Sequence, residues 1–288
     1  MSLYTLSQAM TNQPTLWLTC VALVSLLAGS LLNVVIARLP MQLHQAWRNE
    51  CKQLLDMAPA TSQPTQQAPS LFTPHCPKCH TTLKIWHYIA VISYLIQQGR
   101  SACCGTTISI RYPMIELLTV FLGMVLAWIM GPSLEALLSL LLVYILIALA
   151  CIDIDTKLLP DQLTLTLLWL GLLANSLGTF TSLEAAVWGA IGGYLCLWLV
   201  HQGFFLTTGK QGIGYGDFKL LAAIGAWLGW HALPIVLLVA STAGIVWVFI
   251  LRLSKVEFNP HIPFGPFLAI SCFINLLFGP FIWQVFSG

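Results

Sequence analysis

The chain has 288 residues, of which 58% are hydrophobic and only 8% are charged. An ordinary soluble domain contains about 25% charged residues, so this composition excludes a soluble globular enzyme. The mean hydropathy of +0.83 is typical of a protein with several membrane spans. The formal net charge is +2, without a basic stripe in the sequence, which argues against a nucleic-acid partner.

Long apolar segments predict an all-α polytopic membrane protein of about eight transmembrane helices. A bilayer offers no partner to free backbone N–H and C=O groups, so segments surrounded by lipid must form helices. The sixth segment is short for a helix that spans a bilayer. In chain order, the predicted segments are 16–37, 113–131, 134–152, 163–181, 183–206, 218–230, 232–252 and 263–286.

The basic residues predict which side of the bilayer each connection occupies, because Lys and Arg concentrate in short cytoplasmic loops. Seven of the twelve lie in the polar insertion 38–112, and with eight crossings the other five fall at or beside loops on that same side. Residues 1–15 contain none. We therefore expect both termini to lie outside the cytoplasm and the insertion to lie inside it.

Three parts of the chain follow from these segments. Residues 1–37 form a first transmembrane helix, which we expect to stay uncleaved because no basic residue precedes it and Arg38 follows it. Residues 38–112 form a cytoplasmic insertion, in which the uncharged stretch 58–74 is rich in Pro, Thr, Ser and Gln and predicts a linker. Residues 113–288 form a membrane domain of seven helices that carries the candidate catalytic residues.

The insertion contains a candidate zinc site. Cys76 and Cys79 form a Cys-x-x-Cys knuckle, in which two thiolates can approach one ion, and a tetrahedral zinc site needs two more ligands. Cys103 and Cys104 are the candidates, although adjacent side chains depart from the usual knuckle geometry, and Ser101 stands where a second knuckle would begin. The alternatives are ordinary reduced thiols, or ligation by a nearby histidine: His75, His80 or His87.

Carboxylates beside membrane spans are costly and often mark function. Asp153 directly follows the apolar run that ends the third predicted helix, which makes it the most deeply placed acid. Asp155 is explained by solvation or by pairing with a nearby lysine, and Asp161 by capping of the next helix. Glu116 is expected in the first turn of the second helix, where it meets the helix dipole or pairs with an arginine.

A glycine-rich loop precedes a second candidate, Asp217. Gly214 and Gly216, like the glycines at 209 and 212, permit positive φ and close backbone approach, so the loop delivers Asp217 to the start of the short sixth helix. A phosphate-binding loop is the competing interpretation. It is disfavoured because the loop lacks a Gly-Lys-Ser/Thr ending and follows no predicted strand.

The predicted topology places Asp153 and Asp217 on the same cytoplasmic face. Two carboxylates in a low-dielectric cleft do not readily both ionise, so the pair shares one proton. The ionised partner can then take a proton from water while the protonated partner polarises a peptide carbonyl, which is the chemistry of an aspartic protease. A proton-coupled transporter that uses the same pair is the alternative, although it predicts acids at mid-bilayer rather than at helix ends.

Five stretches resemble, in order, motifs of the type IV prepilin peptidase family, which are membrane aspartic proteases. The segment from Gly214 to Lys219 resembles the family's Gly-x-Gly-Asp-Phe-Lys motif, and the segment from Asp153 to Asp161 resembles its first aspartate motif. The similarity spans nearly the whole chain. The other matching stretches are 29–40, 108–116 and 263–267.

The resemblance implies a bifunctional enzyme of the bacterial inner membrane. Such an enzyme removes the basic leader of type IV prepilins or type II secretion pseudopilins on the cytoplasmic side, then N-methylates the new N-terminal residue from S-adenosylmethionine. It implies catalytic roles for Asp153 and Asp217, with the lipid bilayer and prepilin substrates as partners. Residues of the two motifs are expected to support the pair: Gly214, Gly216, Asp155 and Lys219.

The resemblance also implies a structural zinc ion held by Cys76, Cys79 and Cys104, with Cys103 as the fourth candidate because Ser101 occupies the family's fourth position. Residues 86–90 depart from the family pattern as well. Both departures lie in the insertion, the part associated with methylation, so cleavage and methylation are expected to be separable.

Overall fold

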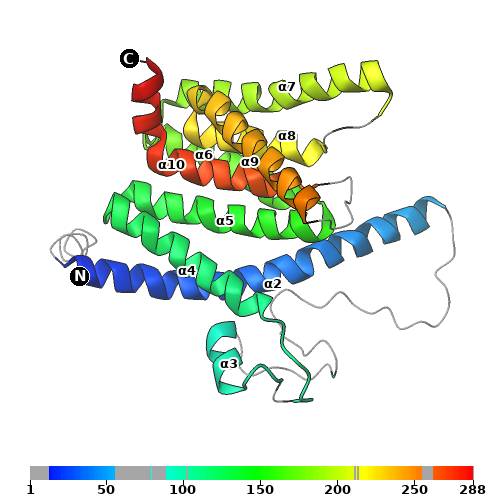
Figure 1. Ribbon diagram of the computed structural model, residues 1–288, viewed down its shortest axis with the longest axis vertical. Helices are drawn as coiled ribbons and strands as arrows, with labels where there is room; N and C mark the ends of the chain where they lie inside the picture. The colour runs from blue at the N-terminus through cyan, green and yellow to red at the C-terminus, as the bar shows by residue number, and fades with distance from the viewer. Residues whose placement is uncertain are drawn as a thin grey trace. The chain divides into compact units, whose positions relative to one another are not determined.

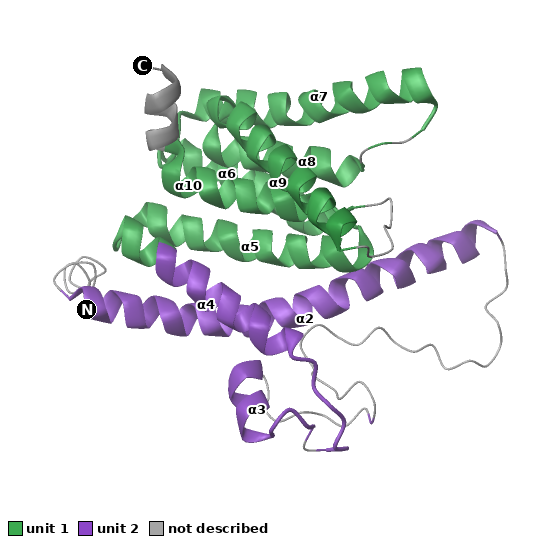
Figure 2. Ribbon diagram, viewed as in Figure 1, with its two compact units in different colours: residues 1–12, 126–288 green, residues 13–125 purple. Residues whose placement is uncertain are grey.

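The computed structural model describes residues 13–55, 79, 89–101, 103–210, 212, 214–254 and 262–287. Within these residues the regular elements are helices, with one isolated bridge between Arg100 and Thr107. The chain divides into two compact units, one of residues 13–125 and one made largely of residues 126–288 (Figure 2). The predicted all-α membrane class is confirmed.

Five candidate membrane spans, by length and composition, are present among the described residues. A further apolar helix, α10 (Gly265–Ser287), is described with its side chains only as far as Gly279. The five spans are α2 (Pro14–Leu54), α4 (Arg111–Met130), α5 (Leu134–Thr156), α7 (Leu183–Thr208) and the segment Trp230–Leu253, which contains η2 (Trp230–Ala232) and α9 (Leu233–Leu253) (Figure 1).

Two of the predicted spans are shorter than a bilayer. The helix α6 (Asp161–Ser176) has 16 residues and α8 (Tyr215–Leu228) has 14. At 1.5 Å per residue these helices are about 24 Å and about 21 Å long, against a hydrocarbon core of about 30 Å. The expected number of eight crossings therefore stays a prediction.

In the unit of residues 13–125, α2 continues past the apolar segment that was expected to end at 37 and runs through 38–54. The extension contains three Gln, three Leu and two Arg, which have high helix propensity and need no lipid contact. The amide of Asn33 donates to the carbonyl of Tyr112 at 3.0 Å and joins α2 to α4. A Cβ on Gly29 would lie 2.9 Å from the Cα of Glu116, so this glycine lets the two helices approach closely.

In the other unit, α8 is the most deeply buried helix. Ten of its 14 residues are buried, among them Phe218 and Trp227. It packs against α6 and α7, and its contact with α7 depends on glycine. A Cβ on Gly189 would lie 2.3 Å from the carbonyl oxygen of Gly225, so the two backbones touch. Protein rather than lipid therefore surrounds α8, which explains why a short helix is sufficient there.

The far end of α8 is held by one buried amide. The Asn175 Nδ2 group donates to the carbonyls of Ala226 and Trp227 at 2.8 and 2.9 Å. Its Oδ1 accepts the backbone N–H groups of Phe180 and Thr181 at 3.1 and 3.0 Å. Asn175 thus ties the end of α8 to the end of α6 and to the loop that follows it.

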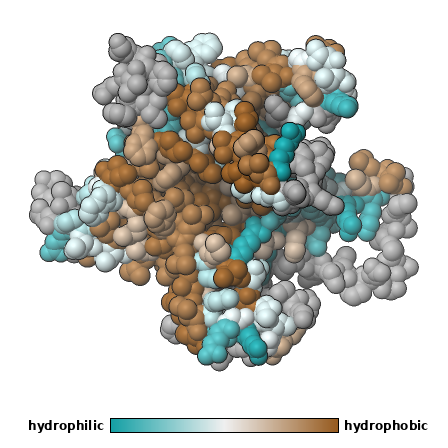
Figure 3. Space-filling view, in the orientation of Figure 1, coloured by the Kyte–Doolittle hydropathy of each residue, from teal (hydrophilic) through white to brown (hydrophobic). Residues whose placement is uncertain are grey.

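Large apolar side chains cover much of the helical surface, as one face of the molecule shows (Figure 3). Soluble monomers rarely expose such continuous apolar area, whereas a membrane protein presents it to lipid. Among the exposed side chains are Phe121, Trp128, Leu173, Trp188 and Phe249.

Candidate active site

Asp153 lies one turn before the end of α5 and is buried, with 5% of its surface exposed. Asp153 is therefore buried in the protein, although Glu116 is more deeply buried, and the depth of Asp153 in the membrane stays a prediction. Its Oδ2 accepts the backbone N–H of Gly265 at 2.9 Å. The helix ends at Lys157, which has a left-handed conformation (φ 56°) and donates its N–H to the carbonyl of Asp153 at 2.9 Å.

Gly265 begins α10 and belongs to the 263–267 stretch, which was singled out only by its resemblance to the family. A Cβ at this position would lie 2.6 Å from Oδ2 of Asp153. A side chain there would collide with the carboxylate, so the close approach requires glycine. No local sequence signal links Gly265 to Asp153, because 112 residues separate them.

Asp217 lies in the first turn of α8 and is also buried, with 8% of its surface exposed. Its N–H donates to the carbonyl of Gly214 at 3.2 Å. Its Oδ1 is buried and has no hydrogen-bond partner among the described residues. The sequence placed Asp217 before the helix, but α8 begins at Tyr215, so the acid sits inside the first turn, where the helix dipole favours a carboxylate.

The two acids are brought together by the packing of three helices. The helix α10 contacts both α5, which carries Asp153, and α8, which carries Asp217. The negative charge of Asp153 disfavours a second negative charge on Asp217. The structure therefore places two buried carboxylates, from different helices, within electrostatic reach of each other.

The glycines before Asp217 act through close approach rather than through unusual dihedral angles. Gly209 has a positive φ of 67° and ends α7, whereas Gly214 and Gly216 do not have a positive φ. A Cβ on Gly216 would lie 2.8 Å from the Cβ of Leu159. Gly216 thus lets the start of α8 pack against the first aspartate motif, between Asp153 and Asp161.

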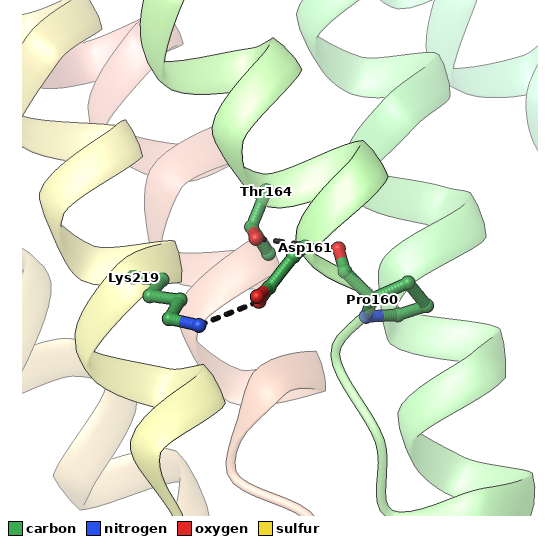
Figure 4. A network of polar contacts seen from close by, with 4 residues as sticks. All are labelled: Pro160, Asp161, Thr164 and Lys219. Carbon is green, nitrogen blue, oxygen red and sulfur yellow. Dashed lines mark hydrogen bonds and ion pairs between the residues drawn. The ribbon is translucent and has the colours of Figure 1, made fainter. Parts of the chain in front are cut away.

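Lys219 joins the two motifs through an ion pair (Figure 4). Its Nζ lies 2.6 Å from Oδ1 of Asp161, and both side chains are partly exposed. The expectation that Asp161 caps α6 is wrong, because Pro160 occupies the N-cap position and the cap has no side-chain hydrogen bond. Asp161 instead lies in the first turn, where its carboxylate is free to reach across to α8.

Asp155 differs from Asp153 although it lies only two residues away. It is exposed, whereas Asp153 is buried. Two residues correspond to about 200° around a helix axis, so the two carboxylates point to nearly opposite sides. The structure does not bring Asp155 into the buried region that holds Asp153.

Glu116 forms a second buried carboxylate site, in the unit of residues 13–125, and its surface is fully buried. It lies beyond the first turn of α4, so the expected interaction with that helix's N-terminus is wrong. Its Oε1 accepts the hydroxyl of Ser30 at 2.5 Å and the N–H of Ala90 at 2.7 Å, and its Oε2 accepts the N–H of Val91 at 2.7 Å. Glu116 thus holds the start of α3 (Ala90–Ile96) to α2 and α4.

Three of the predicted zinc ligands cluster. The sulfur atoms of Cys79, Cys103 and Cys104 lie within 4.8 Å of one another, and all three residues are exposed. Two thiolates bound to one zinc ion at about 2.3 Å lie about 3.8 Å apart in tetrahedral geometry. The Cys103 and Cys104 sulfurs are 3.8 Å apart, so adjacency does not prevent both from facing one ion. The other candidate ligands lie outside the described residues: Cys76, His75, His80 and His87.

These features define a class of protein: a polytopic, all-helical membrane protein with two buried carboxylates at helix ends, as an intramembrane aspartic protease requires. Comparison with known sequences agrees. The type IV leader peptidase family matches residues 140–249, and the bacterial peptidase A24 N-terminal domain matches residues 23–130. The chain belongs to the type IV leader peptidase family.

Several relatives are similar over almost their whole length, and each is named prepilin leader peptidase/N-methyltransferase. The relative from Aeromonas hydrophila is 47% identical over 92% of both chains. The relative from Stutzerimonas stutzeri is 45% identical over 93% of both. The relative from Pseudomonas aeruginosa is 44% identical over 96% of this chain and 95% of its own. No solved structure matches the chain.

Proposed function

We propose that this chain removes the leader peptide from type IV prepilins or type II secretion pseudopilins and then methylates the new N-terminus. The observation that carries the peptidase activity is the buried pair of Asp153 and Asp217, which come from different helices and interact electrostatically. An uncompensated buried charge is costly, so a pair of buried acids calls for a functional explanation.

The pair acts by general acid and base catalysis. The ionised carboxylate takes a proton from water, and the water oxygen attacks the carbon of the scissile peptide bond. The protonated carboxyl group polarises the carbonyl oxygen and stabilises the tetrahedral intermediate. Burial in the helical packing strengthens both interactions, because the local dielectric constant is low.

The surrounding motif residues position the pair. Lys219 and Asp161 fix the first turn of α8 against α6, and Gly216 allows that turn to pack on Leu159. Asp155 is exposed and is assigned no part in the proton transfers.

Basic residues support an orientation with the active site facing the cytoplasm. Lys157 follows α5 directly after the turn that carries Asp153, and Lys219 lies one turn into α8 beside Asp217. Since Lys and Arg concentrate on the cytoplasmic side, the catalytic ends of these helices face that side. In a bacterial cell, this orientation corresponds to a multi-pass protein of the inner membrane.

The methylation step is assigned to the insertion. Cys79, Cys103 and Cys104, together with Cys76, are proposed to hold a structural zinc ion, and such an ion contributes folding free energy to a small domain. S-adenosylmethionine supplies the methyl group. Glu116 connects the insertion to α2 and α4 through the start of α3.

The alternative, proton-coupled transport, is not favoured. A transporter places its acids near mid-bilayer, whereas Asp153 lies one turn from the end of α5 and Asp217 in the first turn of α8. The relatives' names also point to a peptidase.

Mass spectrometry of a prepilin incubated with membranes that contain this chain tests both activities separately. Leader removal gives a shorter product, and methylation adds the mass of one methyl group. Membranes with Asp153→Asn and Asp217→Asn variants are the controls. Leader removal by both variants would contradict the assignment of the pair.

A further inference from the structure

Both buried carboxylates have a backbone hydrogen bond that favours the charged form, but the donors differ: Gly265 at Asp153 and Gly214 at Asp217. The N–H of Gly265 donates to Oδ2 of Asp153 at 2.9 Å. Gly265 is the first residue of a 23-residue helix, so its N–H belongs to the positive end of a helix dipole. Hydrogen bonds from such N–H groups stabilise the ionised form of a carboxylate. The positive charge of Lys157 also stabilises the ionised form of Asp153.

Asp217 is less well prepared to hold a negative charge. The backbone of Gly214 and the first turn of α8 favour a charge there, but Oδ1 is buried without a hydrogen-bond partner among the described residues. The charge of Asp153 opposes a second negative charge at this position. A buried carboxyl oxygen without a donor favours the neutral group, whose O–H can instead donate to a substrate carbonyl.

We propose that Asp153 is the ionised general base of the pair, that Asp217 holds the shared proton, and that the N–H of Gly265 sets this assignment. The inference rests on the proposed peptidase function and adds the role of each acid. Gly265 acts as a positioning residue, since it acts through Asp153 and not on the substrate or the water.

The assignment gives a balanced reaction. Asp153 takes a proton from water as the water oxygen bonds to the carbonyl carbon, and Asp217 gives its proton to the carbonyl oxygen, which forms a tetrahedral diol. The protonated Asp153 then gives its proton to the leaving nitrogen as the C–N bond breaks. Asp217 takes a proton back from one hydroxyl as the carboxyl product forms, so the pair again holds one proton.

Gly265→Ala separates the hydrogen bond from the aspartates themselves. The new Cβ would lie 2.6 Å from Oδ2 and 3.2 Å from Cγ of Asp153, so the carboxylate must move away from the N–H. Gly244→Ala in α9 is the matched control. A Cβ there would meet only the ring of Phe267, at 3.8 Å, which is an ordinary contact.

The first measurement is the pH dependence of kcat/KM for leader removal. A general base must be deprotonated, so activity falls on the acid side. Loss of a donor to ionised Asp153 moves that limb to higher pH, by about one unit, which is about a tenfold loss of activity on the acid side. We expect the plateau at higher pH to change little and Gly244→Ala to match the unmodified protein. An equal loss at every pH, or an unmoved acid limb, would overturn the role of Gly265.

The second measurement does not depend on activity. Infrared spectroscopy of the protein in membranes, at mildly acidic pH, detects the C=O stretch of protonated carboxyl groups. The band should disappear in Asp217→Asn and persist in Asp153→Asn. The reverse pattern would show that Asp217 is the base. Leader removal by both Asn variants would instead contradict the peptidase assignment, which distinguishes the two failures.

Discussion

The ammonium group of Lys219 lies 2.6 Å from Oδ1 of Asp161, 58 residues earlier in the chain, and connects the two aspartate motifs. One partner lies two residues after Asp217, and the other lies eight residues after Asp153. The ion pair therefore fixes the first turn of α8 against α6 close to both buried acids. The ion pair serves to position these helices more than to stabilise the fold, because partly exposed ion pairs contribute only about 0–1 kcal/mol to stability.

Lys219→Gln is expected to lower the rate of leader removal by about fivefold, corresponding to about 1 kcal/mol of lost positioning, with little change in thermal stability. Single-turnover rates of prepilin cleavage measure the effect. Lys210→Gln, which changes an exposed lysine after α7, is the control. A variant with Asp161→Lys and Lys219→Asp should recover part of the rate. If the double variant cleaves no faster than Lys219→Gln, the ion pair does not position α8 for catalysis.

Asp153→Asn and Asp217→Asn should each abolish leader removal while the protein still folds, because an amide keeps the size of the side chain but cannot exchange the shared proton. Asp155→Asn should retain activity, since Asp155 is exposed on the same helix. Cleavage assays with membranes of equal protein content test all three. An indispensable Asp155 beside a dispensable Asp153 would show that the wrong acid of this motif was assigned.

Glu116→Ala should detach the insertion from the membrane helices. The change leaves the Ser30 hydroxyl and the N–H groups of Ala90 and Val91 without their acceptor, and the buried Ser30 hydroxyl alone costs about 1–3 kcal/mol when left unpaired. Hydrogen exchange at 89–101 should become faster, and methylation should fall more than cleavage. Glu135→Gln, which changes an exposed acid at the start of α5, is the control. Unchanged exchange would show that Glu116 does not anchor α3.

Gly189→Ala should destabilise the packing of α7 on α8. Its Cβ would lie 2.3 Å from the carbonyl oxygen of Gly225, and a backbone atom cannot move aside as a side chain can. Overpacking of this kind costs about 1–3 kcal/mol or more. The midpoint of thermal unfolding in detergent should therefore fall. Gly203→Ala, in the same helix with open space around it, should leave the midpoint unchanged or raise it.

Cys79→Ser should release zinc from the insertion and reduce methylation more than leader removal. The site has few thiolates, and a structural zinc ion supplies much of the folding free energy of a small domain. Metal content per chain and the two activities measured separately test this expectation. Cys51→Ser changes an exposed thiol in α2 and is the control. Equal loss of both activities at a normal membrane level would mean that the zinc site also positions the substrate for cleavage.

Composition and local pattern predicted the membrane class and the burial of the first acid. The apolar run before Asp153 indicates a helix that ends at that residue's level, and the glycines before Asp217 indicate a tight connection into a short helix. Such features are local, since each depends on residues within a few turns of one another. The predicted topology placed the two acids on the same face, and the family resemblance added the substrate class and the leader-removal reaction.

Tertiary structure decided which groups surround the acids. Gly265 reaches Asp153 from 112 residues away, and Ser30 reaches Glu116 from 86 residues away. Spacing along the chain cannot specify these contacts, because they depend on which helix faces meet and how closely. Asp161 shows most directly how tertiary packing can override a prediction from local sequence. Its local sequence predicts a helix cap, but the packing of α6 on α8 offers it a cation at 2.6 Å, and the ion pair forms instead.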